Sequence, residues 1–183
     1  MIDKMKFTLF TFSSFLFLFI VRPTLAVSLS LSSSPGVSSI PTLAVNVFLD
    51  TENKKTTGVD LLASFDNKKL KLVSVQKGNL YATYTEPVID NTNGKVSLSA
   101  VVAPETTYQG SGRFAQLVFE PLQNGEAEVM VTYKKGERND SNVADTTGND
   151  ILTEVDNVTV QVSGNGSQMG FFQKLLDLLI FWD

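Results

Sequence analysis

TGVDLLASFDNKKLKLVSVQKGNL, residues 57–80, predicts two β-strands joined by a tight polar corner. The first half alternates between two sets of side chains: Val59, Leu61, Ala63 and Phe65 against Asp60, Leu62 and Ser64. A period of two is typical of a strand with one buried face. The corner, DNKK at 66–69, begins with Asp and Asn, which bond their own backbone and favour turns. We therefore expect strands over 58–65 and 70–76.

The second strand loses its parity, because Val73 and Val75 are apolar as well as Leu70 and Leu72. A β-bulge, or burial on both faces, would explain the slip. Outside this stretch the same alternation predicts strands at 27–31, 43–49, 95–102, 126–133 and 158–162. The nearly continuous apolar run at 114–119 predicts a central strand, and the irregular segment 81–93 could hold a short edge strand. We expect a long polar loop over 134–150. Short strands separated by turn signals such as Asn93-Gly94 predict an all-β sandwich or barrel of about nine strands.

Composition excludes several function classes. The 183-residue chain has a net charge of −4 and contains no cysteine and no histidine. Disulfides, thiolate zinc sites, histidine metal ligands and Ser-His-Asp or Cys-His catalysis are therefore excluded. Loss of Lys4, Lys6, Arg22 and Asp3 with a leader would make the net charge −6. An acidic protein is a poor partner for nucleic acid, whose binding depends on Lys and Arg.

The two ends of the chain differ from the strand region. Residues 1–26 have a positive start, an apolar run at 7–21 and a small-residue end, and they predict a secretory signal peptide cut after Ala26. An uncleaved anchor is the alternative, although the run is shorter than a bilayer span. GNGSQ at 164–168 predicts a flexible linker. Residues 169–183 predict a short amphipathic helix that contacts a membrane interface, docks on the domain or belongs to a longer tail.

A family resemblance is carried by several motifs in order. They are GVDLLASFD at 58–66, the segment 70–78 with its Val-x-x-Gly close, 93–100, GRFAQLVF at 112–119, 125–133 and NDIL at 149–152. In this order and spacing the chain resembles the cohesin domain family over residues 27–163. The resemblance implies a nine-stranded jelly-roll β-sandwich, related in fold to carbohydrate-binding modules, and no catalysis.

The resemblance also implies a binding surface. Cohesins bind dockerin domains on the flat sheet that contains their strands 8, 3, 6 and 5. Carried onto this sequence, the candidate partner-binding residues are Asp60, Leu62, Ser64, Ser97, Ser99, Val101, Glu126, Glu128, Met130 and Thr132. Two segments depart from the family pattern, 81–93 at strand five and 134–150 after strand eight. The chain contains no dockerin repeat, so the partner would be another chain.

Three other interpretations concern chemistry and ligands. Asp60, Glu126 and Glu128 could supply a carboxylate pair for glycoside hydrolysis, but solvated strand charges explain them as well. The loop 139–150 is rich in oxygen ligands suited to Ca²⁺, yet it lacks the EF-hand spacing, and Asp, Asn and Gly also build ordinary turns. Carbohydrate binding could use Tyr81, Tyr84 and Tyr108, although no flat aromatic row is visible.

The sequence thus predicts a secreted or cell-surface binding module that is not an enzyme. We expect no cofactor, with calcium in the 139–150 loop as an alternative. The expected partner is a dockerin-like or other extracellular protein, held against one sheet face. Leu62, Val101 and Met130 would supply its apolar contacts. The alternative function is a carbohydrate-binding module in polysaccharide binding or breakdown.

Overall fold

The computed structural model describes residues 26–35 and 42–163, and these residues form strands, bridges and turns. Apart from Ala26, the predicted signal peptide lies outside the described residues, as do the predicted linker at 164–168 and tail at 169–183. Within the described part of the chain, no helix has the length and apolar character needed to span a membrane.

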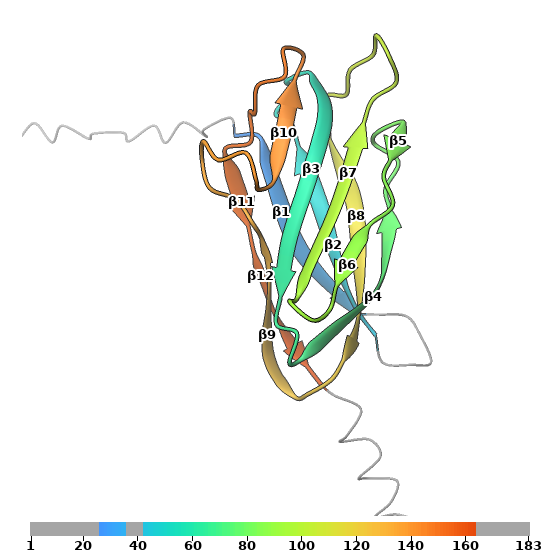
Figure 1. Cartoon of the computed structure of the whole chain (residues 1–183), viewed down its shortest axis with the longest axis vertical. Helices are drawn as coiled ribbons and strands as arrows, with labels where there is room; N and C mark the ends of the chain where they lie inside the picture. The colour runs from blue at the N-terminus through green and yellow to red at the C-terminus, as the bar shows by residue number, and fades with distance from the viewer. Residues whose placement is uncertain (1–25, 36–41, 164–183) are drawn as a thin grey trace, which may run out of the picture.

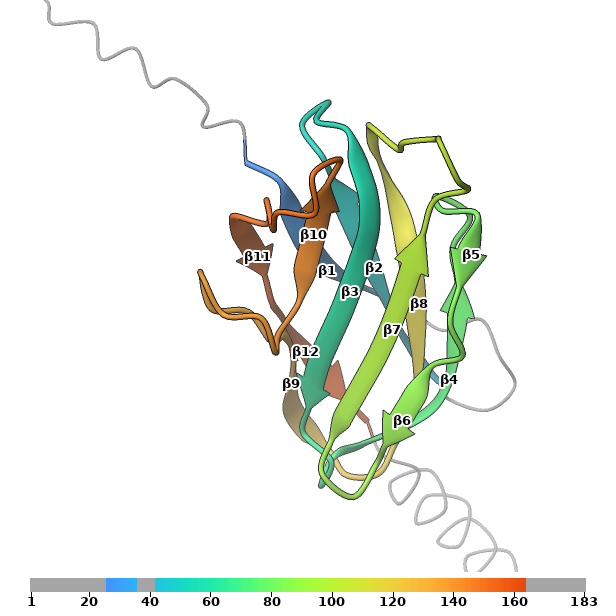
Figure 2. The same cartoon turned by 45° about the horizontal axis from the view of Figure 1, so that its top comes forward.

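Within the described residues, twelve strands form two sheets that pack face to face (Figures 1 and 2). In chain order they are β1 (Ser28–Pro35), β2 (Leu43–Asp50), β3 (Thr56–Phe65), β4 (Leu70–Lys77), β5 (Thr83–Tyr84), β6 (Val88–Asp90), β7 (Lys95–Val101), β8 (Ser111–Pro121), β9 (Gly125–Val131), β10 (Asn142–Asp145), β11 (Glu154–Asp156) and β12 (Val158–Val162). One sheet has the order β11-β1-β2-β8-β4. The other has the order β12-β9-β3-β7-β5, with β10 also paired to β3 and β6 to β7. The prediction of an all-β sandwich is confirmed.

The predicted count of nine strands is wrong by three short elements. The segment 81–93 holds two strands, β5 and β6, where one edge strand was expected. The expected polar loop at 134–150 contains β10, and β11 precedes the last strand. These strands have two to four residues each, so they are too short to show a period of two.

The polar corner at 66–69 joins the two sheets. Its turn is closed by the Asp66 backbone carbonyl, which accepts from Lys69 N at 3.1 Å and Leu70 N at 2.8 Å. The Asp66 carboxylate accepts from Lys68 N at 3.1 Å. Since β3 lies in one sheet and β4 in the other, the chain crosses the sandwich at this corner and does not form a hairpin.

The core lies between the sheets and contains the alternating apolar set of the first strand. Val59, Leu61, Ala63 and Phe65 are all buried. Phe65 meets Phe119 of the opposite sheet edge to face, with ring centroids 5.2 Å apart. Burial of a side chain such as Leu61 contributes about 2 kcal/mol. The slip in the second strand is a β-bulge, because the register with β8 shifts between Leu72 and Ser74 and leaves Val73 exposed.

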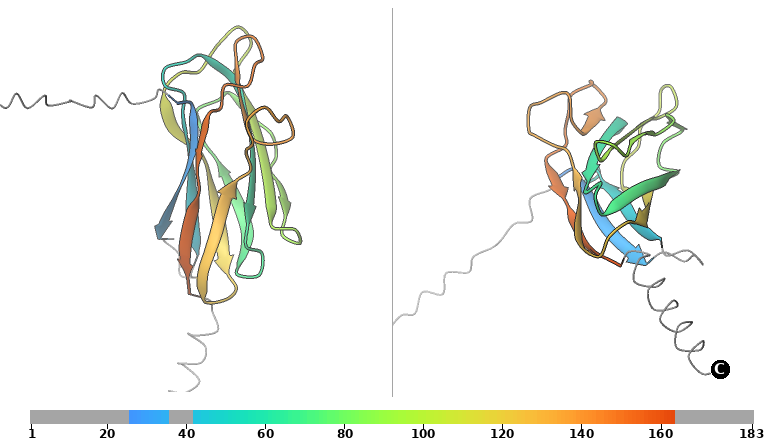
Figure 3. Two further views of the ribbon diagram at one scale, coloured as in Figure 1. Left: turned by 90° about the vertical axis from the view of Figure 1, so that its left-hand side faces the viewer. Right: turned by 60° about the horizontal axis from the view of Figure 1, so that its bottom comes forward.

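Two strands share one edge of β3, and this arrangement shapes the candidate site. β9 pairs with the end of β3, where Ala63 lies opposite Val131. β10 pairs with the beginning of β3, where Asn142 lies opposite Asp60. Between them the chain leaves the sheet as a loop of residues 132–141, here called the β9–β10 loop. Figure 3 (left) shows this loop projecting on the side of the seven-stranded sheet.

Candidate partner-binding face

The candidate residues come together on the outer side of the seven-stranded sheet, here called the outward face. Alternation along β3 turns Asp60, Leu62 and Ser64 away from the core. The register with β7 places Asp60 opposite Ser99 and Leu62 opposite Ser97, and Ser64 lies opposite Met130 of β9. The structure brings all ten predicted residues onto this face: Asp60, Leu62, Ser64, Ser97, Ser99, Val101, Glu126, Glu128, Met130 and Thr132. Their role in binding stays a prediction.

Apolar side chains interrupt the polar surface of the outward face. Met130 is 40% exposed, Val101 is 51% exposed and Val88 of β6 is 67% exposed. Leu62 is half-buried among them. Exposed apolar groups surrounded by polar ones are the composition of a protein–protein interface.

Sequence reasoning missed Val88 and Lys95, which belong to the same face. Val88 lies opposite Ser97 and Asp90 lies opposite Lys95, across the turn at Asn93-Gly94. Counting back from a two-residue turn at Asn93-Gly94 would have set Val88 opposite Ser99, on the correct face but two residues out of register, because the turn has four residues, 91–94. The three-residue length of β6 hid the alternation that would have shown it as a strand.

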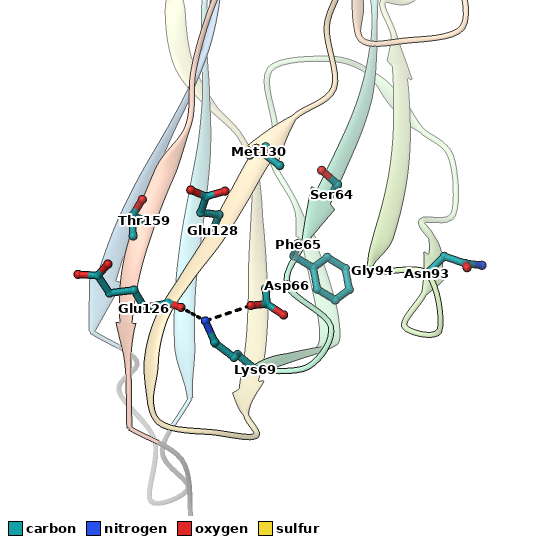
Figure 4. Close-up of a pocket in the computed structure, with 10 residues that line it drawn as sticks. All are labelled: Ser64, Phe65, Asp66, Lys69, Asn93, Gly94, Glu126, Glu128, Met130 and Thr159. Carbon is teal, nitrogen blue, oxygen red and sulfur yellow. Dashed lines mark hydrogen bonds and ion pairs between the residues drawn. The ribbon is translucent and has the colours of Figure 1, made fainter.

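One end of the outward face is a hollow of about 570 Å³ with an acidic lining (Figure 4). Lys69 pairs with Asp66 at 3.3 Å and donates to the Glu126 carbonyl. Burial works to raise the pKa of the Asp66 carboxyl, but the Lys68 backbone N–H and the Lys69 ammonium outweigh it and lower the pKa. The Glu128 carboxylate makes no hydrogen bond or ion pair with any described residue, and it lines the hollow.

The middle of the outward face holds a smaller hollow of about 290 Å³. Its lining is partly apolar, from Leu62, Ala63, Val88 and Val96, and partly polar, from Asp90, Lys95, Ser97 and Thr132. Asn139 of the β9–β10 loop closes one side. This hollow could accept an apolar side chain from a partner.

Asp60 lies apart from the other two carboxylates that were considered for hydrolysis. Asp60 lines a third hollow, of about 600 Å³, beside β10, whereas Glu126 and Glu128 line the acidic hollow at the other end of the face. Solvated strand charges therefore describe Asp60, Glu126 and Glu128 better than a catalytic pair does.

The acidic groups of the 139–150 loop bond to the loop itself. Asp140 accepts from Lys134 N through Oδ2, and Asp150 Oδ1 accepts from Val143 N and Leu152 N at 3.0 Å each. Asp145 accepts from Thr147 and Asn149, and these hydrogen bonds lower the pKa of its carboxyl. Among the described residues, no three His, Cys, Asp or Glu side chains gather as a metal-binding group.

The tyrosines considered for carbohydrate binding point into the molecule. Tyr81 is only 5% exposed, and its hydroxyl lies 2.6 Å from Thr56 Oγ1. Its ring packs on Tyr108 at 5.3 Å between centroids, and Tyr84 packs on Phe114 at 5.4 Å. Tyr84 belongs to β5, inside the segment 81–93 where a short edge strand was expected. Stacked against one another, these rings do not offer the flat aromatic platform that a sugar would need.

The known proteins that this chain resembles are cohesin domains. The family model described as the cohesin domain matches residues 29–162. No curated protein sequence matches the chain. Among solved structures, the sixth cohesin of scaffoldin B from Acetivibrio cellulolyticus, in complex with a Cel5 dockerin, has a TM-score of 0.58 and 18% identity. That match covers 75% of this chain and 99% of the other.

Two further structures show the same likeness. The cohesin of the Coh-OlpA-Doc918 complex from Clostridium thermocellum has a TM-score of 0.59 and 12% identity, covering 75% of this chain and 99% of that one. A type II cohesin module from the adaptor ScaA scaffoldin of Acetivibrio cellulolyticus has a TM-score of 0.55 and 14% identity, covering 79% and 96%. At these identities the structural matches show the shared fold.

Proposed function

Because the chain belongs to the cohesin domain family, we propose that it is a non-catalytic module that docks a dockerin-like protein on its outward face. The observation that carries this proposal is that three apolar side chains, Met130, Val101 and Val88, are exposed on the same face as half-buried Leu62. A partner that covers these apolar side chains removes their surface from water, and this lowers the free energy of the complex. The solved relatives supply the partner class, since several of them are complexes with dockerins.

The way in which a partner binds is constrained by the sheet. β3, at the centre of the outward face, is already paired with β7 on one edge and with β9 and β10 on the other. An added strand therefore has no free backbone edge at the centre of the face. The partner must bind through side chains, and a helix that presents an apolar stripe meets that requirement.

Export places the module where such a partner would be met. The N-terminal pattern at 1–26 supports secretion with cleavage after Ala26, and cellulosome-type scaffolds, to which relatives such as scaffoldin B belong, act outside the cell. We assign the chain a secreted or cell-surface location. Direct polysaccharide binding is the weaker alternative, because Tyr81, Tyr84 and Tyr108 pack against each other or the core.

A parallel binding assay separates the two functions. Calorimetric titration of the full chain with a panel of dockerin modules is expected to give saturable binding to at least one of them. Co-sedimentation of the same chain with insoluble cellulose is expected to leave the protein in the supernatant. Sedimentation with cellulose and no binding to any dockerin would overturn the proposal.

A further inference from the structure

The outer side of the five-stranded sheet, here called the rear face, carries little charge. It lies behind the seven-stranded sheet in Figure 1, and β1, β2, β8 and β4 supply its side chains. Two rows of side chains cross its centre, one from Ser32 to Gln76 and the other from Ser34 to Ser74, and neither row contains an acidic or a basic residue. In a chain with 19% charged residues, these rows form a surface that a partner can cover without removing a charge from water.

An amide pair at the centre of the rear face has one donor and one acceptor to spare. Gln116 Nε2 donates to Asn46 Oδ1 at 2.8 Å, between β8 and β2. The remaining groups, Asn46 Nδ2 and Gln116 Oε1, bond to none of the described residues. A two-fold axis parallel to the strands, between β2 and β8, would set Asn46 of one copy over Gln116 of a second copy. Each spare donor would then meet a spare acceptor, twice in the dimer.

The neighbouring row of the rear face adds an aromatic ring and a cation. Phe48 is 39% exposed and lies opposite Arg113, whose side chain makes no ion pair or hydrogen bond within the described part of the chain. The same two-fold axis would set Phe48 over Arg113 of the second copy, and a guanidinium stacks well on an aromatic face. Asp50 follows one row further along β2. Its carboxylate would lie beside that same arginine, so the cation would gain both a ring and an acidic partner.

Net charge restricts which surfaces of two copies can meet. The chain has a net charge of −4, so two copies repel each other unless the surfaces in contact are uncharged or pair opposite charges. The rear face meets both conditions, because its central rows are uncharged and Arg113 and Asp50 are placed to pair across the axis. A second copy supplies the amides, the ring and the carboxylate in matching positions. The rear face is therefore self-complementary.

We propose that the rear face binds a second copy of this chain in a two-fold dimer, with β2 of each copy over β8 of the other. Packed sheets lie about 10 Å apart, a distance that facing Asn and Gln side chains can bridge. The face measures about 20 Å along β1 and about 20 Å across four strands, so each copy covers about 400 Å². A standard interface buries about 800 Å² per partner, and we therefore expect a weak dimer with a Kd of about 100 μM. Both outward faces point away from this contact, so the proposal does not depend on the docking function.

Sedimentation equilibrium of the full chain, from about 10 μM to about 1 mM, measures this association. Phe48→Lys removes the ring and sets a second cation beside Arg113 of the other copy, so it is expected to weaken the dimer by at least about 10-fold. Met130→Lys is the control, because Met130 is 40% exposed on the outward face and the change in net charge is the same. Thermal unfolding establishes that both variants fold. Met130→Lys should leave the dimer unchanged and weaken dockerin binding, whereas Phe48→Lys should do the reverse, which separates a failure of the dimer from a failure of the docking function.

Mixing two variants tests the two-fold pairing itself. Asn46→Lys and Gln116→Glu are each prepared as full chains and then mixed in equal amounts. The mixed dimer sets opposite charges over each other across the axis, so it is expected to form about 10-fold more tightly than the dimer of either variant alone. No gain on mixing would overturn the pairing of β2 with β8. A monomer at every concentration, or association that Phe48→Lys leaves intact, would overturn the inference and leave the rear face to the 169–183 tail or to a different partner.

Discussion

A single glycine sets how closely two neighbouring strands of the five-stranded sheet, β4 and β8, can approach each other. Gly78, directly after β4, donates its backbone N–H to the Phe114 carbonyl at 2.8 Å. A Cβ at this position would lie 2.3 Å from the Arg113 carbonyl oxygen and 2.5 Å from that of Phe114. Both obstacles are backbone atoms of the long strand β8, which has little freedom to move. The Val-x-x-Gly close of the sequence thus has a steric cause.

The first prediction concerns that contact. Gly78→Ala is expected to lower the free energy of unfolding by about 2–3 kcal/mol, because β8 must shift to admit a methyl group. Asn79→Ala, at the exposed next residue, is expected to change it by less than about 0.5 kcal/mol. Urea unfolding of both variants measures the difference. Equal stability of the two would show that the backbone near Gly78 adjusts freely.

Tyr81 gives the second prediction, on pH dependence. Burial raises the pKa of its hydroxyl from 10.0 to about 12. The folded state therefore keeps this proton at pH values where the unfolded chain has lost it, so stability is present below pH 10 and falls as pH rises towards 12. The loss attributable to Tyr81 is about 2 kcal/mol, once solvent screening is allowed for.

Comparison with Tyr81→Phe isolates this effect. The variant loses the hydrogen bond to Thr56 and about 1 kcal/mol at neutral pH. Thr56 keeps its bond to the Tyr108 carbonyl at 3.0 Å, so it is not left unpaired. Between pH 10 and 12 the unfolding free energy of the Tyr81→Phe variant should fall less steeply than that of the unaltered chain. If the unfolding free energies of the two chains fell equally steeply with pH, the pH dependence could not be assigned to Tyr81. Burial also raises the pKa values of Tyr84 and Tyr108, so a shallower decline remains.

At the scale of elements, the long strands are predictable and the short ones are not. β2, β3, β7 and β9 each have seven or more residues, which is enough for alternation to show their buried side. β10 has four residues and lies in a polar segment. It becomes a strand only because β3 offers a free edge beyond the end of β9. That edge is a tertiary feature, which local sequence does not record.

The third prediction concerns Asn91, whose side chain forms hydrogen bonds that link the two sheets. Its side chain accepts from Leu72 N at 2.8 Å and donates to the Leu72 carbonyl at 3.0 Å, so a residue between β6 and β7 pairs the edge strand β4 beside its bulge. Asn91→Asp keeps the acceptor and replaces the donor by a charge facing a carbonyl. We expect a loss of about 2 kcal/mol and faster amide exchange at Leu72.

The same isosteric change at Asn79 serves as the control for this clasp. Asn79 is exposed, and its side chain has no hydrogen bond with the described residues. Asn79→Asp is therefore expected to leave both unfolding and Leu72 exchange nearly unchanged. Equal effects of the two substitutions would mean that Asn91 does not hold the edge of β4.

At the scale of the whole molecule, parity and family resemblance together placed the candidate residues on one face. Alternation alone could separate Asp60, Leu62 and Ser64 from the core set, but it could not say which strands lie beside β3. The family pattern supplied the neighbours β7 and β9, and the register confirms them. Two of the three hollows depend on Val88 or on the β9–β10 loop, whose positions follow from pairing between segments far apart in the sequence.

The central claim is that the outward face, and not the opposite sheet, holds the partner. Met130 and Val73 are matched for the test, because they are 40% and 45% exposed on opposite sides of the sandwich. Titration with a dockerin that binds the unaltered full chain should show at least about 100-fold weaker binding for Leu62→Asp with Met130→Asp, equivalent to about 2.7 kcal/mol. Val73→Asp should bind like the parent. Full binding by the outward-face variant, or its loss in Val73→Asp, would contradict the account.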